Sequence, residues 1–165
     1  MNQFRFYGFS DYEDGKIASL ETVGEYEIPL NVFIDNASEF DDIDECFCTV
    51  DLYGIGSEIE VFPSEEAYRA ADKKLAVISM IPIGTFSAQP DDESFQPSPH
   101  ILFTGKVLYV ERDPNAGADE PNCFASVETL ELKINLYFRY DGPVEEGYII
   151  YGVAWLYGDM EVENE

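Results

Sequence analysis

Apolar residues recur at every second position along this chain far more often than with the 3.6-residue period of a helix. The clearest segment is residues 131–140, ELKINLYFRY, whose alternate apolar residues are Leu132, Ile134, Leu136, Phe138 and Tyr140. A strand with this pattern has one buried face and one face in water. Residues 148–157, YIIYGVAWLY, are apolar on both faces and follow the turn-rich residues 141–147. The two segments therefore predict an antiparallel hairpin with a central second strand, and Trp155 is expected in the core.

Further strands are predicted upstream. Residues 44–53 alternate, with Cys46, Cys48, Val50 and Leu52 on one face, and Gly54 and Gly56 then indicate a turn before a short strand at 58–62. Residues 25–35 predict a strand placed toward a sheet edge by Pro29. Residues 75–81 return to strand, and residues 101–112 place Ile101, Phe103, Val107 and Tyr109 on one face around Gly105.

One helix is predicted, over residues 64–74. Ser64 can cap its start, Glu65 and Glu66 lie at the positive end of its dipole, and Lys73 and Lys74 lie at the negative end. Residues 84–100 form a long Pro-rich acidic loop, and residues 159–165 are expected to fray. The pattern reveals no internal repeat and no shift in composition, which predicts a single domain over residues 1–165.

Gly105 and Gly152 both interrupt long strands, and such glycines often mark a bulge or a sharp bend. The predicted fold class is therefore mainly β, an antiparallel and strongly curved sheet with one short helix. The segments HILFTGKVLYVE and YIIYGVAWLYG, within roughly the last 70 residues, resemble those of small bacterial proteins with an OB-type barrel. That resemblance implies a five-stranded barrel that binds an oligonucleotide or an oligosaccharide on one face.

The charge changes this expectation. The chain carries 34 acidic and 9 basic residues, a formal net charge of −25. Because the acids are spread along the chain, the folded surface is negative, and it repels phosphate backbones and anionic lipid surfaces. We therefore expect no nucleic-acid partner and no membrane contact. A basic protein partner or a neutral ligand fits the charge better.

Candidate chemistry is sparse. Cys46, Cys48 and Cys123 are too few, and odd in number, for a disulfide framework, so we expect reduced thiols and a cytoplasmic protein. A zinc site from these cysteines and His100 lacks the usual ligand spacing, and the acids of residues 35–45 lack the central glycine of a calcium loop. We expect no metal, no cofactor and no catalytic residue, and the sequence does not define an oligomeric state.

Binding is the remaining class of function. Two segments combine carboxylates with apolar residues, as protein interfaces do. The candidate partner-binding residues are Asp35, Glu39, Phe40, Asp41, Asp42, Asp44 and Glu45 in the first segment, and Asp91, Asp92, Glu93 and Phe95 in the second. The leading hypothesis is a non-catalytic acidic domain that masks a basic protein, like an inhibitor or immunity protein. The alternatives are an OB-type barrel that binds a neutral ligand such as a carbohydrate, and a structural or oligomer-forming accessory domain.

Overall fold

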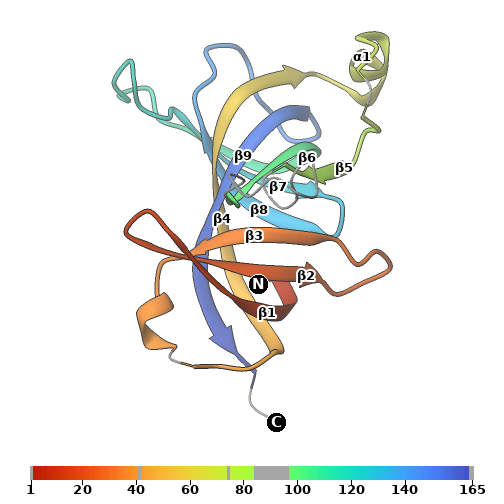
Figure 1. Ribbon diagram of the computed structural model, residues 1–165. Helices are drawn as coiled ribbons and strands as arrows, with labels where there is room; N and C mark the ends of the chain where they lie inside the picture. The colour runs from red at the N-terminus through yellow and green to blue at the C-terminus, as the bar shows by residue number, and fades with distance from the viewer. Residues whose placement is uncertain (1, 41, 74, 84–96, 164–165) are drawn as a thin grey trace. The chain divides into compact units, whose positions relative to one another are not determined.

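The computed structural model describes residues 2–40, 42–73, 75–83 and 97–163. They contain strands β1 (Asn2–Tyr12), β2 (Gly15–Thr22), β3 (Pro29–Ile34), β4 (Cys46–Phe62), β5 (Ser79–Pro82), β6 (His100–Arg112), β7 (Cys123–Thr129), β8 (Leu132–Phe138) and β9 (Ile149–Val162), the 3-10 helix η1 (Ala37–Glu39) and the helix α1 (Glu65–Ala70). The strands form one sheet in the order β1-β2-β3-β9-β4-β8-β7-β6-β5, and β1 also pairs with β4 and β6 with β9 (Figure 1). The predicted class, mainly β with a curved sheet and one short helix, is confirmed.

The described chain divides into two compact units, and the single domain over residues 1–165 stays a prediction. Unit 1 holds residues 1–52, 82–101 and 156–165, and unit 2 holds residues 53–81 and 102–155. The two longest strands, β4 and β9, each contribute one part to each unit.

Unit 1 is a ring of five strands, in which β1, β2, β3, β9 and β4 follow one another and β4 pairs again with β1. Its antiparallel pattern is interrupted once, because β3 and β9 run parallel through Phe33 and Tyr157. Alternate residues point into the ring and are buried, among them Phe4, Phe6, Leu20, Leu30, Val32, Cys48 and Val50. The predicted inward face of β4 is therefore confirmed.

Unit 2 repeats this arrangement with β6, β7, β8, β4 and β9, and here β8 and β4 are the parallel pair. Its buried residues include Phe103, Val107, Val127, Ile134, Leu136 and Phe138. The helix α1 adds Tyr68, which is 2% exposed and donates its hydroxyl to the carbonyl of Leu75 at 2.7 Å. Ser64 caps α1 by accepting a hydrogen bond from the amide of Ala67, as predicted, but the helix ends at Ala70 rather than at Lys74.

The two units also share sequence. Residues 17–22 (IASLET) in β2 match residues 124–129 (FASVET) in β7, and residues 30–34 (LNVFI) in β3 match residues 134–138 (INLYF) in β8. The tripeptide LYG occurs in both long strands, ending at Gly54 and at Gly158. The pairings agree, because Leu20 lies opposite Phe6 and Leu30, and Val127 lies opposite Val107 and Ile134. The chain therefore contains an internal repeat, which the pattern of apolar residues alone did not reveal.

Both copies of the repeat contain a β-bulge at the same place, and this bulge accounts for one wrong prediction. The pairing of β1 with β2 shifts between Phe6 and Gly8, and the pairing of β6 with β7 shifts at the matching place, between Val107 and Tyr109. One extra residue reverses which face the following side chains occupy. Tyr109, predicted to share the inner face with Val107, is therefore 45% exposed.

Five further expectations differ from the structure. In the described part of the chain, the hairpin predicted from residues 131–140 and 148–157 does not form, because β8 pairs with β4 and β7 and not with β9. β4 runs without a break through Gly54 and Gly56, where a turn was predicted. β9 continues to Val162, where a frayed end was predicted. Trp155 is half-buried rather than in the core. Pro29 begins β3, which lies between β2 and β9 and is not an edge strand.

Candidate functional site

A strip of three aromatic rings lies on unit 1, across the ends of β1 and β3 and an inner position of β9. The Phe33 ring contacts Tyr157 at a centroid distance of 5.8 Å and Tyr12 at 6.3 Å. Phe33 reaches over β2 at Gly15, where a Cβ atom would stand 2.4 Å from the tip of the Phe33 ring. All three rings are half-buried, so the strip presents both apolar area and ring edges at the surface.

An acidic groove of about 840 Å³ runs beside this strip. It begins at the two-residue turn between β1 and β2, where Glu13 adopts a left-handed φ of 51°. Its walls are Asp11, Glu13, Asp14, Gly15, Lys16, Phe33, Ile34, Asp35, Ala37, Ser38 and Phe40. Four carboxylates and one ammonium therefore surround two phenylalanine side chains.

The segment that carries Asp35 is held firmly on β9. The amide of Asp35 donates to the carbonyl of Gly158 at 2.8 Å, which extends the parallel pairing of β3 with β9 by one residue. Asn36 then pairs with the backbone of Met160 twice, donating its Nδ2 to the carbonyl at 2.9 Å and accepting the amide at 2.8 Å. The same Nδ2 donates to Glu39 at 2.6 Å. These bonds fix the far wall of the groove before any ligand binds.

Phe40 also lines a second groove, of about 560 Å³. The other lining residues are Asn36, Glu39, Asp51, Asp159, Met160, Glu161 and Val162, so four more carboxylates lie here. Phe40 thus separates two acidic hollows on unit 1. We call the strip and the two grooves together the acidic aromatic site.

The tyrosines of the strip stay neutral in this surrounding. Burial raises the pKa of Tyr12, and the Glu13 carboxylate raises it further. Burial likewise raises the pKa of Tyr157, with smaller contributions from Tyr12, Glu13 and Asp35. A negative potential favours the protonated phenol, and the same potential attracts cations.

The predicted site residues fall into three groups. Asp35, Glu39 and Phe40 line the grooves. Asp42, Asp44 and Glu45 are exposed and line neither groove. Asp41, Asp91, Asp92, Glu93 and Phe95 lie outside the described residues.

Sequence reasoning missed the hairpin acids Asp11, Glu13 and Asp14, and the β9 acids Asp159 and Glu161. The letters YEDG at residues 12–15 are typical of a tight turn and could have placed the first group at a hairpin tip. The second group reaches the site only because β9 pairs with β3, a contact between residues more than 120 positions apart.

The cysteines and the histidine have structural surroundings. Cys48 and Cys123 are buried and Cys46 is half-buried, and none of the three forms a disulfide. Burial, with smaller contributions from Cys46 and Glu163, raises the pKa of Cys48 to about 12. Burial lowers the pKa of His100, whose Nδ1 lies 2.6 Å from the Ser98 hydroxyl. Among residues 2–40, 42–73, 75–83 and 97–163, no three or more His, Cys, Asp or Glu side chains gather closely enough to hold a metal ion.

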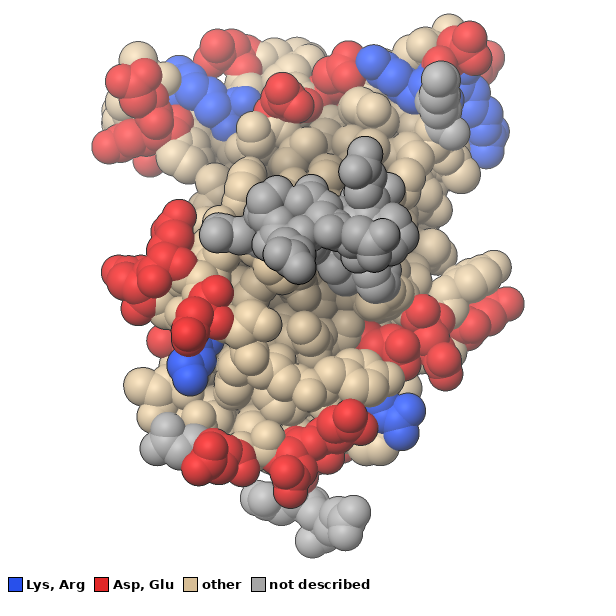
Figure 2. Space-filling view, viewed as in Figure 1, with Lys and Arg blue, Asp and Glu red and all other residues tan. Residues whose placement is uncertain are grey.

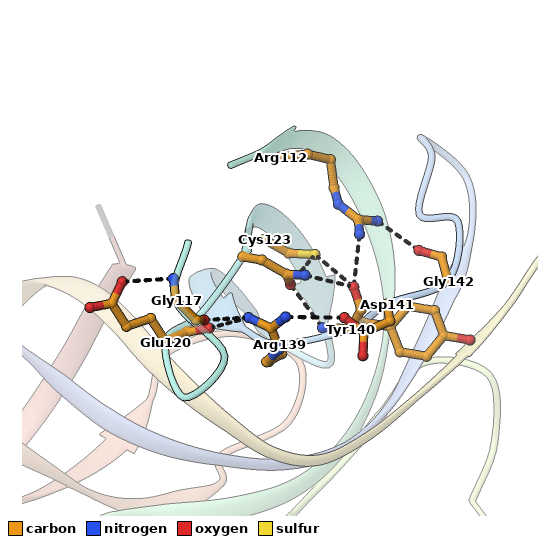
Figure 3. A network of polar contacts seen from close by, with 9 residues as sticks. Arg112, Gly117, Glu120, Cys123, Arg139, Tyr140, Asp141 and Gly142 are labelled. Carbon is orange, nitrogen blue, oxygen red and sulfur yellow. Dashed lines mark hydrogen bonds and ion pairs between the residues drawn. The ribbon is translucent and has the colours of Figure 1, made fainter. Parts of the chain in front are cut away.

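In unit 2, two arginines bind the carbonyls of neighbouring loops (Figure 3). Arg112 donates to the carbonyls of Gly142 and Tyr140, each at 2.7 Å. Arg139 donates to the carbonyls of Gly117 at 2.6 Å and Glu120 at 3.0 Å. Since these guanidinium groups are used to hold loops, this cluster is structural.

Acidic side chains outnumber basic ones on the face drawn in Figure 2, and they form several separate groups. Within the described part of the chain, the structure contains no helix of the length and apolar character that a membrane crossing requires. No protein-family model matches the chain, and no curated protein or solved structure is significantly similar to it. The function is therefore inferred from the geometry and the charge of the acidic aromatic site.

Proposed function

We propose that the protein is a non-catalytic binding domain that masks a basic surface of a protein partner at the acidic aromatic site. The observation that carries the proposal is the groove in which Asp11, Glu13, Asp14 and Asp35 surround Phe33 and Phe40. Arginine and lysine side chains bring both a cation and an apolar stem, so they match carboxylates and aromatic rings at once.

The rest of the molecule supports this role. A net charge of −25 raises the rate at which a basic partner arrives, while the local carboxylates determine where it docks. The wall bearing Asp35 is fixed by the Asn36–Met160 bonds, so little ordering entropy is lost on binding. An inhibitor that covers a phosphate-binding site on its partner requires these properties.

The test compares two variants with equal net charge. The site variant is Asp11→Asn, Glu13→Gln and Asp35→Asn, and the control variant is Glu25→Gln, Glu27→Gln and Glu111→Gln, three exposed acids that line neither groove. Binding of nona-arginine and nona-lysine peptides is measured by calorimetry at low and high salt. We expect the site variant to bind roughly tenfold more weakly than wild type, because three ion pairs of the exposed kind are lost.

The control variant should bind within about twofold of wild type. Equal weakening of both variants would show that net charge alone attracts the peptide, and would contradict the proposal. Peptide binding to wild type that does not weaken when the salt is raised from about 20 to about 500 mM would contradict the proposal as well.

A further inference from the structure

The outer face of unit 2 carries a second aromatic strip, on β8, β4 and β7. Of these strands, β8 and β4 match β3 and β9 of the acidic aromatic site, whereas β7 matches β2. The Tyr137 ring of β8 contacts Phe124 of β7 at a centroid distance of 5.0 Å and Tyr53 of β4 at 6.3 Å. In the internal repeat, Tyr137 corresponds to Phe33 and Tyr53 to Tyr157. The ring pair of unit 1 is therefore repeated here.

Polar groups lie next to these rings. Ser126 of β7 is opposite Asn135 of β8 on one side and Tyr109 of β6 on the other. This row supplies an amide and two hydroxyls beside the row of rings. Tyr137 is 40% exposed and Tyr109 45%. We call these residues the unit 2 ring face.

The matching position in unit 1 is closed by the chain itself. Asn31 corresponds to Asn135, but it is only 4% exposed, and its amide is 3.5 Å from the carbonyl of Ser98. Asn135 is half-buried rather than buried, so this position is more accessible in unit 2 than in unit 1. The two copies have thus diverged in what covers them.

They have also diverged in charge. Where unit 1 has Asp35 after β3, unit 2 has Arg139 after β8. The charges next to the unit 2 ring face alternate in sign, since Glu128 lies opposite Lys106 and Lys133. The other acids that act on this face are Glu111, which accepts a hydrogen bond from the hydroxyl of Tyr109, and Glu146, whose charge also acts on Tyr109. They are offset by Lys106, Lys133 and Arg139. In a chain of net charge −25, this face is close to neutral.

We propose that the unit 2 ring face is a second binding site, and that it takes a neutral carbohydrate. Flat exposed rings stack against the apolar faces of sugar rings, and the amide and hydroxyls match sugar hydroxyls. Nucleobases also stack on such rings. Their phosphates, however, are repelled by the overall charge, so the neutral ligand is favoured.

The test uses the full chain on an array of neutral oligosaccharides of glucose, galactose, mannose and N-acetylglucosamine. The strongest binder is then titrated by calorimetry against wild type, Tyr137→Ala, Tyr137→Phe and Asn135→Ala, with Asp35→Asn as a control in unit 1. We expect Tyr137→Ala to weaken binding about tenfold, because a stacking ring is lost. Tyr137→Phe should retain most of the affinity, Asn135→Ala should lose part of it, and Asp35→Asn should bind like wild type.

Several results would overturn the proposal. The proposal is wrong if wild type binds no neutral oligosaccharide. It is also wrong if wild type binds one and neither Tyr137→Ala nor Asn135→Ala weakens that binding. A thymidine 20-mer that binds through Tyr137 would show a nucleic-acid site instead. A dimer that sedimentation detects in wild type and that is lost in Tyr137→Ala would show that a second copy covers the face.

Discussion

Asn36 joins the acidic segment to β9 with two hydrogen bonds to the backbone of Met160. In Asn36→Ala the amide and the carbonyl of Met160 both lose their hydrogen-bond partner, at a partly buried position. We expect the free energy of unfolding to fall by about 1–3 kcal/mol, measured by urea denaturation. Ser38→Ala, on the exposed side of η1, is the control and should change it by less than about 0.5 kcal/mol. Equal stability of the two variants would show that these bonds contribute nothing.

Cys48 tests the burial of the unit 1 core by its chemistry. Because burial raises its pKa from 9.0 to about 12, its thiolate fraction at pH 8 is roughly a thousandfold lower than that of a free thiol. We expect iodoacetamide at pH 8 to leave Cys48 unmodified in the native protein and to modify all three cysteines in denaturant, as read by mass spectrometry. Rapid native modification of Cys48 would contradict the burial.

The same pKa shift predicts that the free energy of unfolding falls as the pH rises. The thiol is neutral in the folded state up to a higher pH than in the unfolded state. The contribution of the Cys48 thiol to the free energy of unfolding is therefore complete below pH 9, and it is lost as the pH rises from about 9 toward 12. Cys48→Ser should reduce overall stability, because a hydroxyl replaces a buried sulfur. It should also flatten this alkaline loss, because the serine hydroxyl does not ionise in this pH range. An unchanged alkaline slope would contradict the assignment.

The two LYG tripeptides offer a matched pair of strand substitutions. At Gly158 a Cβ atom would stand 2.6 Å from the carbonyl oxygen of Asp51, which belongs to the backbone and cannot move aside. At Gly54 the nearest atoms are side-chain carbons of Ile134 and Leu136, both at 3.3 Å. We expect Gly158→Ala to cost about 3 kcal/mol or more and Gly54→Ala about 1 kcal/mol, by urea denaturation. A larger cost at Gly54 would mean that β4 and β9 approach each other differently.

The alternation in residues 44–53 and 131–140 predicted which faces of β4 and β8 are buried, because period two follows from strand geometry alone. Tyr109 was misplaced because a bulge reverses the faces and leaves little mark in composition. The acids at Asp35 and Glu39 were predicted, since they lie in one segment. Asp159 was missed, because only the pairing of β9 with the distant strand β3 brings it to a groove. Asp11 was missed although it lies beside the tip of a local hairpin, which the letters YEDG indicate.

The internal repeat places the fourth strand of each copy in both units. β4 pairs with β1 of its own copy through Phe47 and Cys48, and with β8 of the other copy through Tyr53 and Gly54. β9 pairs with β3 in the same exchanged manner. Local pattern cannot predict this exchange, because a strand that pairs within its own copy and one that crosses to the other have the same alternation. The second acidic groove depends on it, since its lining residues Asp159 and Met160 come from the second copy.

Net charge acts on the whole chain and gives a test that no single side chain determines. With 34 acids against 9 bases, repulsion between carboxylates opposes the compact state, because unfolding moves the charges apart. Raising the salt from 0.01 to 0.1 M shortens the screening length from about 30 to about 10 Å. We expect the melting temperature to rise by about 2–4 °C, the equivalent of about 1 kcal/mol for a chain of this size.

Sodium and potassium chloride should raise the melting temperature equally, as screening requires, whereas a rise with only one cation would indicate specific ion binding. A melting temperature that falls with either salt would show that attractive ion pairs, such as Lys73 with Glu60 at 2.9 Å, outweigh the repulsion.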